Sequence, residues 1–356
     1  MKPINQIHLS KPMVRQIQQE FKNKVILITG GTGSFGKKCV DLLNQFCAPE
    51  KVIIFSRDEL KQHEMRVSGY NQDHLRYFIG DVRDQDRLRR AMNGVDYVIH
   101  AAALKQVPTC EYNPMEAIQT NVIGTKNIID AAIDTGVTKV MALSTDKAVN
   151  PANLYGATKL CAEKLLLQSN AYSGEKGTRF SCVRYGNVVG SRGSVIPIFL
   201  EQKAKGHLTV TDPRMTRFWI TLDQGVYFVL SCLTQMEGGE VFVPKIPSTK
   251  IVDLVDVIAP ECKVDYIGIR PGEKLHEILI GEDEARHTVE TEGMYVVQPV
   301  YPACHNVKWN KSKKLPDGFS FSSQNNSWWL KRDEIEVIVE THSNTSPMRR
   351  PRAVGE

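Results

Sequence analysis

Two neighbouring segments of the sequence carry side chains that can move protons while a carbon is oxidised. Ser144-Thr145-Asp146-Lys147 is followed by Tyr155, eight residues after the lysine, and then by Lys159. A Tyr-x-x-x-Lys spacing places the phenol and the ammonium about one turn apart on one face of a helix. Because a nearby cation favours the phenolate, Tyr155 is a candidate base for a hydroxyl proton while a nicotinamide accepts the hydride.

Asp146 and Lys147 add a second acid and a second base, which a simple alcohol dehydrogenase does not need. A lysine is a base only when neutral, so the pKa of Lys147 must be lowered by burial or by positive charge, with Lys159 and an oxidised nicotinamide as candidates. Asp146 must be protonated to act as an acid, which requires a desolvated setting. The alternative is a salt bridge between neighbours on a loop.

A glycine-rich turn offers a place for a dinucleotide. Residues 24–28 are an apolar run typical of a buried strand, the turn 29–36 follows directly, and a helical segment comes next. Gly30 permits the tight turn, Gly33 lets the backbone approach a pyrophosphate, and Gly36 allows close packing of the helix. The helix N-terminus would then direct free N–H groups at the anion. A glycine turn without a ligand is the alternative.

The end of the second expected strand, residues 52–55, bears on the choice of dinucleotide. An acid at this place usually holds the ribose 2′-hydroxyl of NAD. Here Arg57 comes first and Lys61 follows one helical turn later, and two cations suit the 2′-phosphate of NADP better. NAD remains an alternative cofactor, because the carboxylate of Asp58 could turn toward its ribose. A solvated helix start is the remaining alternative.

Further strands are expected at residues 75–79, 96–100, 139–143 and 179–185, alternating with helical stretches. The alternation predicts an α/β fold with a doubly wound parallel sheet, whose ligands bind beyond the carboxyl ends of the strands. The glycine turn, Arg57, Asp81, Ala102 and Thr145 all follow such ends.

The chain divides into four expected parts. Residues 1–23 form an N-terminal extension, with Met13, Val14, Ile17 and Phe21 at helical spacing. Residues 24–185 form the NADP-binding domain with the catalytic residues, 186–330 mainly a smaller substrate-binding lobe, and 331–356 a C-terminal tail. Polar composition predicts disorder from Thr341 onward.

Composition narrows the class of protein. With 356 residues and 42% hydrophobic content, the chain can bury one large core and a smaller one. No apolar run reaches a membrane span and the N-terminus does not read as a secretory signal, so we expect a cytoplasmic protein without membrane contact. The 8 cysteines form no CxxC pair and are expected to be reduced, and no metal is expected. The net charge of +5 suits an anionic small-molecule ligand and is too diffuse to indicate nucleic acid.

Longer motifs complete the pattern. Together with the glycine turn and the Tyr155/Lys159 pair, the stretches His100–Ala103 and Asn121–Thr125 resemble the extended short-chain dehydrogenase/reductase superfamily, which has a Rossmann fold. More narrowly, the sequence is similar to the inverting UDP-N-acetylglucosamine 4,6-dehydratases that begin pseudaminic acid synthesis, in Phe55–Lys61, Leu104–Pro108, Ser144–Ala148 and Arg184–Val188. Retaining dehydratases of the glucose type carry Asp-Glu where this chain has Asp146-Lys147.

This resemblance implies loss of water from UDP-N-acetylglucosamine with NADP as cofactor. Tyr155 would take the proton of the C4 hydroxyl near Thr145 while NADP⁺ takes the hydride, and Lys159 would hold the nicotinamide ribose. Lys147 would then take the C5 proton and Asp146 would protonate the departing C6 hydroxyl. Hydride return to C6 and reprotonation of C5 on the other face give UDP-2-acetamido-2,6-dideoxy-β-L-arabino-hex-4-ulose. A homo-oligomer is also implied.

The expected sites draw on the motifs above. The catalytic residues are Thr145, Asp146, Lys147, Tyr155 and Lys159. The cofactor is expected at Gly30, Thr32, Gly33, Ser34, Phe35, Gly36, Ser56, Arg57, Lys61, Asp81, Val82, Ala101, Ala102, Lys105, Tyr155 and Lys159. The substrate is expected at Lys105, Asn187, Arg192, Thr209, Arg217 and Arg270.

Three of the substrate residues have more specific expected roles. Arg217 and Arg270 are candidates for the diphosphate, because arginine presents a fixed fork of donors, although either alone could be a surface charge. The backbone around Thr209 could pair with the edge of a uracil.

Two other functions stay open. A UDP-N-acetylhexosamine 4-epimerase needs Tyr155 and Lys159 but not Asp146 and Lys147, and capsule-type dehydratase/epimerases share nearly the same motifs. A non-catalytic NADP-sensing protein would need neither the tyrosine nor the lysine.

Overall fold

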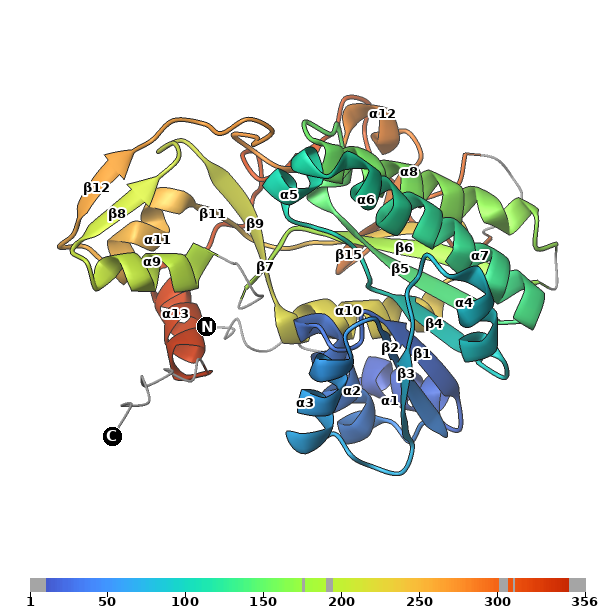
Figure 1. Cartoon of the computed structure of the whole chain (residues 1–356). Helices are drawn as coiled ribbons and strands as arrows, with labels where there is room; N and C mark the ends of the chain where they lie inside the picture. The colour runs from blue at the N-terminus through green and yellow to red at the C-terminus, as the bar shows by residue number, and fades with distance from the viewer. Residues whose placement is uncertain (1–10, 175–176, 190–194, 301–306, 310, 346–356) are drawn as a thin grey trace, which may run out of the picture.

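The computed structural model describes residues 11–174, 177–189, 195–300, 307–309 and 311–345, which form a large lobe and a smaller one (Figure 1). In this part of the chain the large lobe is built on a 10-stranded sheet in the order β16-β14-β15-β10-β6-β5-β4-β1-β2-β3. Its parallel strands are β1 (Val25–Thr29), β2 (Lys51–Ser56), β3 (Leu75–Ile79), β4 (Tyr97–His100), β5 (Lys139–Thr145), β6 (Arg179–Tyr185) and β10 (Val241–Pro244). The antiparallel strands at one edge are β15 (Met294–Val297), β14 (Thr288–Glu290) and β16 (Lys313–Lys314).

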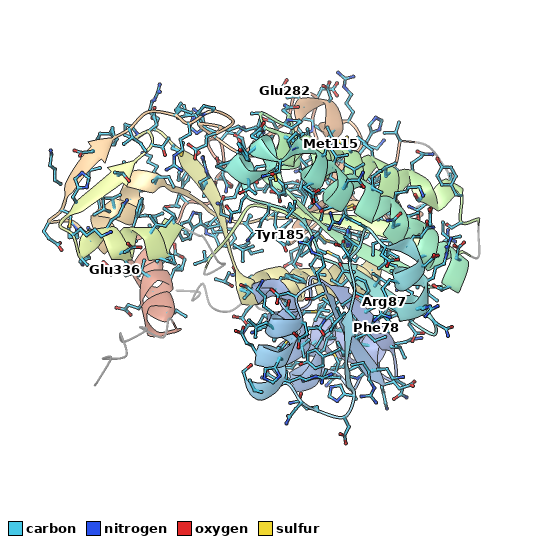
Figure 2. The ribbon with its side chains drawn as sticks, viewed as in Figure 1. Phe78, Arg87, Met115, Tyr185, Glu282 and Glu336 are labelled. Carbon is cyan, nitrogen blue, oxygen red and sulfur yellow. The ribbon has the colours of Figure 1, made fainter. Side chains whose placement is uncertain are left out.

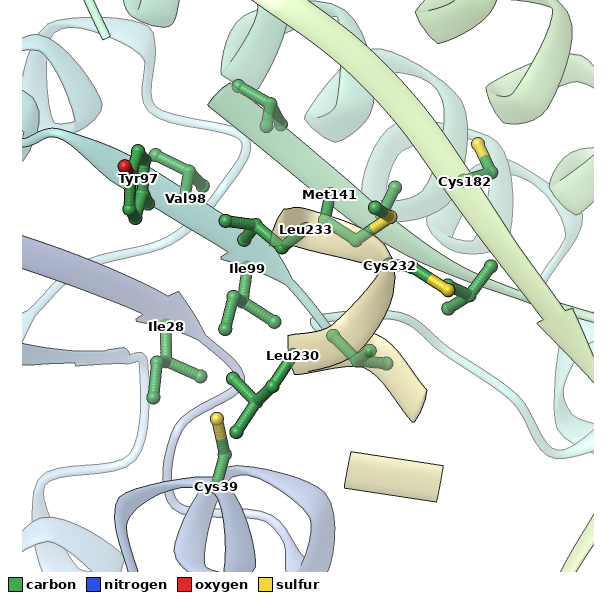
Figure 3. Packing of buried hydrophobic residues seen from close by; sticks show 14 of the residues in the cluster. Ile28, Cys39, Tyr97, Val98, Ile99, Met141, Cys182, Leu230, Cys232 and Leu233 are labelled. Atoms are coloured by element: carbon green, nitrogen blue, oxygen red, sulfur yellow. The ribbon is translucent and has the colours of Figure 1, made fainter. Parts of the chain in front are cut away.

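Helices cover both faces of this sheet, which explains why its central strands are apolar throughout. One face carries α1 (Lys11–Phe21), α2 (Ser34–Phe46) and α10 (Leu222–Gln235), and the other carries α4 (Gln85–Met92), α7 (Gly124–Thr135) and α8 (Leu154–Gln168) (Figure 1). Leu230 and Leu233 of α10 pack toward Ile99 and Met141 of the sheet (Figure 3). All residues of β1 are buried, as a strand covered on both sides requires. The predicted doubly wound parallel sheet and its six expected strands are therefore confirmed.

Shorter elements connect these layers. They are α3 (Glu59–Val67), α5 (Val107–Tyr112), α6 (Pro114–Ile118), the π-helix η1 (Gln119–Ile123), the single turns η2 (Asp146–Ala148), η3 (Ser169–Ala171) and η4 (Val307–Trp309), the helix α12 (Glu282–Ala285), and the strands β13 (Ile278–Ile280) and β17 (Phe321–Ser322). Among the helices of the described ranges, none is long and apolar enough to cross a bilayer.

The N-terminal helix α1 is fixed to the large lobe. Ile17 and Phe21 are buried in its core. Glu20 accepts hydrogen bonds from the Tyr97 hydroxyl at 2.8 Å and from Nζ of Lys139 at 2.6 Å, at the amino ends of β4 and β5. The helical spacing seen in the sequence is confirmed, and the helix docks on its own chain.

The smaller lobe has its own apolar core. It contains α9 (Val195–Lys203), α11 (Ile251–Ile258) and α13 (Arg332–Thr345), the parallel pair β8 (His207–Val210) and β12 (Lys263–Tyr266), and the sheet β7 (Asn187–Val189), β9 (Thr216–Thr221) and β11 (Ser248–Lys250). Between β9 and β11 the chain returns to the large lobe as α10 and β10, so residues after 185 contribute to both lobes.

The C-terminal helix corrects one expectation. Ile335 and Ile338 of α13 are buried in the core of the smaller lobe, and α13 packs against α11. Disorder from Thr341 onward is therefore wrong for residues 341–345, which continue this helix. The polar composition of the segment concealed it, because two apolar residues on one face are enough to dock a helix. Residues 346–356 lie outside the described part.

A buried arginine joins the strands and helices that surround the ends of β5 and β6. Arg184 of β6 is 1% exposed, and its guanidinium donates to both carboxylate oxygens of Glu163 on α8 (2.6 and 3.2 Å) and to Glu284 of α12 (2.8 Å). It also donates to the carbonyl of Leu279 at 2.9 Å. Ser144, directly before Thr145, donates to the same Glu163 carboxylate. These hydrogen bonds hold the end of β5 against the middle of α8.

Replacing Arg184 with methionine should lower the free energy of unfolding by about 3–5 kcal/mol, because Glu163 would remain as a buried carboxylate without its counter-ion. Urea denaturation followed by circular dichroism measures this change. Arg89 on the exposed face of α4 also pairs with two carboxylates, those of Asp86 and Asp134, and Arg89→Met serves as control with a midpoint near that of the wild type. Equal midpoints for the two variants would show that the buried network adds no stability.

Candidate active site

A cavity of about 680 Å³ opens at the carboxyl ends of the parallel strands. Tyr185, at the end of β6, lies between the two lobes and lines it (Figure 2). The expected site residues that line this cavity come from the glycine turn, from the segments after β4 and β5, from α8 and from the smaller lobe: Gly30, Thr32, Gly33, Ser34, Phe35, Lys61, Ala101, Ala102, Lys105, Thr145, Asp146, Lys147, Tyr155, Lys159, Asn187 and Arg270.

The glycine turn forms a cradle that fits the pyrophosphate of a dinucleotide. Gly30 has a φ of +66°, and a Cβ there would lie 3.0 Å from the backbone nitrogen of Ala102. A Cβ on Gly36 would lie 2.4 Å from Cα of Gly31, so α2 starts directly against the turn. The N-cap of α2 is Gly33, which has no side chain to satisfy the first N–H groups. These groups remain available for an anion.

The side chains around the end of β2 are engaged with one another. Asp58 caps α3 by accepting from the backbone nitrogen of Lys61 at 3.0 Å, and it pairs with Nζ of Lys61 at 2.5 Å. Arg57 is half exposed and lies 3.5 Å from Asp81. The carboxylate of Asp58 is thus occupied at the helix N-terminus, and the partly exposed cations of Lys61 and Arg57 are paired with Asp58 and Asp81.

Five expected cofactor residues do not line the cavity and instead lie behind it or at its edge: Gly36, Ser56, Arg57, Asp81 and Val82. The Ser56 hydroxyl is bonded to the Thr32 hydroxyl at 3.0 Å. Val82 is buried, in a position where a Cβ on Gly124 would lie 2.7 Å from it.

Two buried residues from the motifs hold the loops on the other side of the cavity. Nδ1 of His100 bonds the Thr29 hydroxyl at 2.8 Å, and burial together with the charge of Lys159 lowers the pKa of His100 to about 3, so the ring is neutral. Asn121, in the π-helix η1, bonds both the N–H and the carbonyl of Leu104 at 2.9 Å. Asn121 thereby fixes the start of the segment that carries Lys105. The motifs that contain His100 and Asn121 therefore hold the loops that border the cavity.

The catalytic candidates meet where α8 begins. A Cβ on Gly156 would lie 2.1 Å from the carbonyl oxygen of Lys147, so only glycine lets α8 pack directly on η2. Asn153 caps α8 by accepting from the Gly156 nitrogen at 2.8 Å, and its amide donates to the carbonyl of Gly272 in the smaller lobe at 2.8 Å. This packing brings Tyr155 beside Thr145, to which its hydroxyl is hydrogen bonded.

Lys147 lies between two buried carboxylates. Its Nζ is 3.1 Å from Oδ1 of Asp146, which also accepts from the Thr145 hydroxyl at 2.9 Å, and 3.2 Å from Oε1 of Glu277. Burial alone would favour the neutral amine, but the two carboxylates outweigh it and raise the pKa of Lys147. The expectation of a lysine with a lowered pKa is therefore wrong for this arrangement, because the sequence does not show Glu277 as a neighbour.

The tyrosine also departs from expectation. Burial raises the pKa of Tyr155 to about 12, against the opposing effects of Lys147 and of the Thr145 hydroxyl. The cation that favours its phenolate is therefore Lys147, where the sequence suggested Lys159. Burial lowers the pKa of Lys159 itself, which is nearly inaccessible to solvent.

A second cavity of about 330 Å³ lies in the smaller lobe and shares Asn187, Val188, Arg270 and Glu273 with the first. Arg217 and Thr209 line it. Within the described residues, the Arg270 guanidinium has no hydrogen bond or ion pair, and Arg270 is exposed at the junction of the two cavities.

Arg217 is held by the protein itself. Its terminal nitrogens donate to the carbonyls of Thr216, Lys274 and Leu275 and to Sδ of Met215, and its Nε faces Glu277 at 3.9 Å. All five N–H donors of an arginine are accounted for in this way. The expected diphosphate role is thus better placed on Arg270.

Thr209 is engaged in a similar way. Its backbone nitrogen donates to Oε1 of Gln202 at 3.1 Å, and Nε2 of Gln202 donates to its hydroxyl at 2.8 Å. Gln202 on α9 therefore occupies the backbone N–H of Thr209, and pairing of this strand with a uracil edge stays a prediction for the rest of its backbone. Arg192 lies outside the described residues.

Comparisons with known proteins agree with this site. A family model described as polysaccharide biosynthesis protein matches residues 26–299. The chain is 54% identical over 328 residues to UDP-N-acetylglucosamine 4,6-dehydratase (inverting) of Campylobacter jejuni, with 90% of this chain and 98% of the relative covered. It is 45% identical over 336 residues to UDP-glucose 4-epimerase of Rickettsia canadensis, with 90% and 96% covered.

Solved structures show the same architecture. Pen from Bacillus thuringiensis superposes with a TM-score of 0.83 at 37% identity, over 92% of this chain and 99% of that one. DesIV, a dTDP-glucose 4,6-dehydratase from Streptomyces venezuelae, shares the fold with a TM-score of 0.66 at 20% identity, over 90% and 97%. The chain therefore belongs to the polysaccharide biosynthesis protein family and has the Rossmann fold of the extended short-chain dehydrogenase/reductases.

Proposed function

We propose that the protein is an NADP-dependent, C5-inverting UDP-N-acetylglucosamine 4,6-dehydratase. The observation that carries this proposal is the convergence of Asp146 and Lys147 with Tyr155 in the cavity that also contains the glycine cradle. The relative at 54% identity bears the same activity in its name.

The first step concerns C4 of the hexose. A bound nicotinamide dinucleotide supplies the hydride acceptor at C4 and later the hydride donor at C6. Tyr155 takes the proton of the C4 hydroxyl, and the neighbouring Thr145 hydroxyl and the charge of Lys147 stabilise the phenolate that accepts it. Lys159, buried one turn further along α8, orients the ribose.

The second step needs a neutral amine and a protonated carboxyl at the same time. Transfer of one proton from Nζ of Lys147 to Oδ1 of Asp146, along their 3.1 Å hydrogen bond, produces both. Lys147 then takes the C5 proton, Asp146 gives its proton to the C6 oxygen, and the C6–O bond breaks as water leaves. The two side chains return to the ammonium and the carboxylate seen in the structure. A solvent proton added to C5 from the opposite face inverts that centre, and Tyr155 releases the proton of the former C4 hydroxyl to solvent.

We infer NADP as the cofactor from the end of β2. Asp58 is occupied in capping α3 and in pairing with Lys61, whereas Arg57 is half exposed at the rim. A 2′-phosphate placed there would meet two cations, while a ribose diol would lack a free carboxylate.

The family resemblance supports three further parts of the proposal: a cytoplasmic protein, assembly as a homo-oligomer, and a product that feeds pseudaminic acid synthesis. A 4-epimerase is the second candidate, because a relative at 45% identity is named UDP-glucose 4-epimerase and the Tyr155/Lys159 pair suits both reactions.

Incubation of the protein with NADP⁺ and UDP-N-acetylglucosamine in deuterated water tests the proposal. We expect a 4-keto-6-deoxy product that has lost one water and carries solvent deuterium at C5, measured by mass spectrometry and proton NMR. Formation of UDP-N-acetylgalactosamine without loss of water would instead identify an epimerase.

The variants Lys147→Ala and Asp146→Asn should bind NADP⁺ like the wild type but lose water about 10²–10⁴-fold more slowly, because each lacks one proton-transfer group of the elimination. Product formation is followed by ion-pair chromatography, and cofactor binding by fluorescence. Lys205→Ala and Asp86→Asn, both on the exposed surface, are the matched controls. Normal rates in either test variant contradict the assigned roles.

Arg57→Ala should weaken binding of NADP⁺ by about tenfold or more, the size expected for one charge-assisted hydrogen bond, and should leave NAD⁺ binding nearly unchanged. Calorimetric titration of the cofactor-free protein with each dinucleotide gives both constants. Asp58→Asn is the companion variant. If it weakens NAD⁺ binding selectively while Arg57→Ala affects both cofactors equally, the site prefers NAD.

A further inference from the structure

Glu277 is a deeply buried acid that touches the catalytic lysine and lines neither cavity. It directly precedes β13, is 2% exposed, and places Oε1 at 3.2 Å from Nζ of Lys147, nearly the distance of Asp146 on the other side. The side chains that line the two cavities include Lys147 but not Glu277. Any influence of Glu277 on a bound sugar therefore passes through its ion-pair partners that line the cavities, Lys147 and Arg217.

The position of Glu277 is fixed by its backbone. Its nitrogen donates to the hydroxyl of Ser323 at 3.0 Å, and the nitrogen of Ser323 donates back to its carbonyl at 2.8 Å. The Ser323 hydroxyl is also bonded to that of Thr216 at 2.7 Å, in the strand that carries Arg217. The carboxylate is therefore presented to Lys147 from a rigid support.

Arg217 gives Glu277 a counter-ion that does not depend on Lys147. Its Nε lies 3.9 Å from Oε1 of Glu277, and its remaining donors are held by backbone carbonyls that include Lys274 and Leu275. A buried carboxylate without a partner is costly. With Arg217 in place, the Glu277 carboxylate keeps a cationic neighbour when Lys147 becomes neutral.

Two buried oxygens next to Lys147 have no hydrogen-bond partner among the described residues: Oδ2 of Asp146 and Oε2 of Glu277. Buried acceptors are rarely left unsatisfied, so each of these oxygens is open to a further donor. Oδ2 of Asp146 faces the side on which the sugar would lie, near Gly186. Oε2 of Glu277 is an open acceptor beside the lysine amine.

We propose that Glu277 is the positioning residue of the elimination: its carboxylate, 3.2 Å from the Lys147 amine, holds that side chain in place and sets the pH range in which the amine is a base. The inference rests on the proposed dehydratase function. A neutral amine keeps two N–H groups and one lone pair. When Glu277 holds one N–H group, the lone pair that the transfer to Asp146 exposes can turn to the cavity once Asp146 gives its proton to the C6 oxygen.

The charges around Lys147 explain the effect on pH. Asp146 adjoins it in η2, Glu277 precedes β13, Arg217 lies on β9, Lys274 lies in the loop before Glu277, and Tyr155 lies on α8. The two carboxylates outweigh burial and the cation of Arg217, and raise the pKa of Lys147. Removing one negative charge should therefore let Lys147 lose its proton at lower pH.

The variants Glu277→Gln and Glu277→Ala separate the charge from the hydrogen bond. In both we expect the acid limb of the kcat–pH profile for water loss to move down by about one pH unit or more, since an opposite charge at this distance shifts a pKa by that amount. At the plateau, kcat should fall further in Glu277→Ala than in Glu277→Gln, because the amide still accepts an N–H bond. Glu284→Gln, which removes a buried carboxylate facing Arg184, should leave the limb in place.

A second measurement does not depend on the reaction. Trace acetylation of Lys147 in the free protein, read by peptide mass spectrometry across pH, reports its protonation directly, and the midpoint should be lower in Glu277→Gln than in the wild type. An unchanged midpoint and an unchanged acid limb would overturn the role of Glu277. Failure of the wild type to dehydrate the sugar would overturn the proposed function, while the acetylation midpoints would still decide whether Glu277 controls Lys147.

Discussion

The buried ion pair between Arg184 and Glu163 is the interaction on which the reactive part of the molecule depends. It joins β6 to α8, and through Ser144 it reaches the last residues of β5. Burying two charges is costly, so the pair is favourable only because nearly every donor and acceptor is satisfied by further hydrogen bonds. The pair fixes the position of the strand that carries Thr145 relative to the helix that carries Tyr155.

The proposed chemistry depends on how Lys147 and its two neighbouring carboxylates share one proton. The structure places an ammonium between two carboxylates, which is the resting arrangement of lowest electrostatic cost. Elimination requires the opposite arrangement, a neutral amine beside a protonated acid. Transfer of one proton from Lys147 to Asp146 converts the first arrangement into the second, and no other group takes part in this transfer.

The sequence predicted the parts of the fold and site that are local in the chain. Short apolar runs ended by glycine or polar residues and alternating with helical stretches indicate buried strands of an α/β sheet, and the residues 144–159 are close enough in sequence for their meeting to be expected. The choice of Asp146, Lys147 and Tyr155 as one cluster followed from this proximity. Gly156 is the residue that makes the contact possible.

The parts that could not be predicted depend on contacts between distant segments. Glu277 is far from Lys147 in the sequence, and its neighbours in the chain do not distinguish it from a surface carboxylate. The sequence therefore could not predict that the pKa of Lys147 is raised. For the same reason Arg217 appeared free to bind a phosphate and the Thr209 backbone appeared open. The sequence did not predict α13, because its apolar residues are few and are buried only through contact with α11.

Asn153 links the two lobes through one amide group. Its oxygen caps the helix that presents the phenol, and its nitrogen is bonded to Gly272, in the segment that reaches across both cavities. A rigid-body displacement of the smaller lobe is therefore transmitted to the first turn of α8. If the smaller lobe binds the nucleotide as proposed, its position bears through this one amide on where the Tyr155 hydroxyl lies.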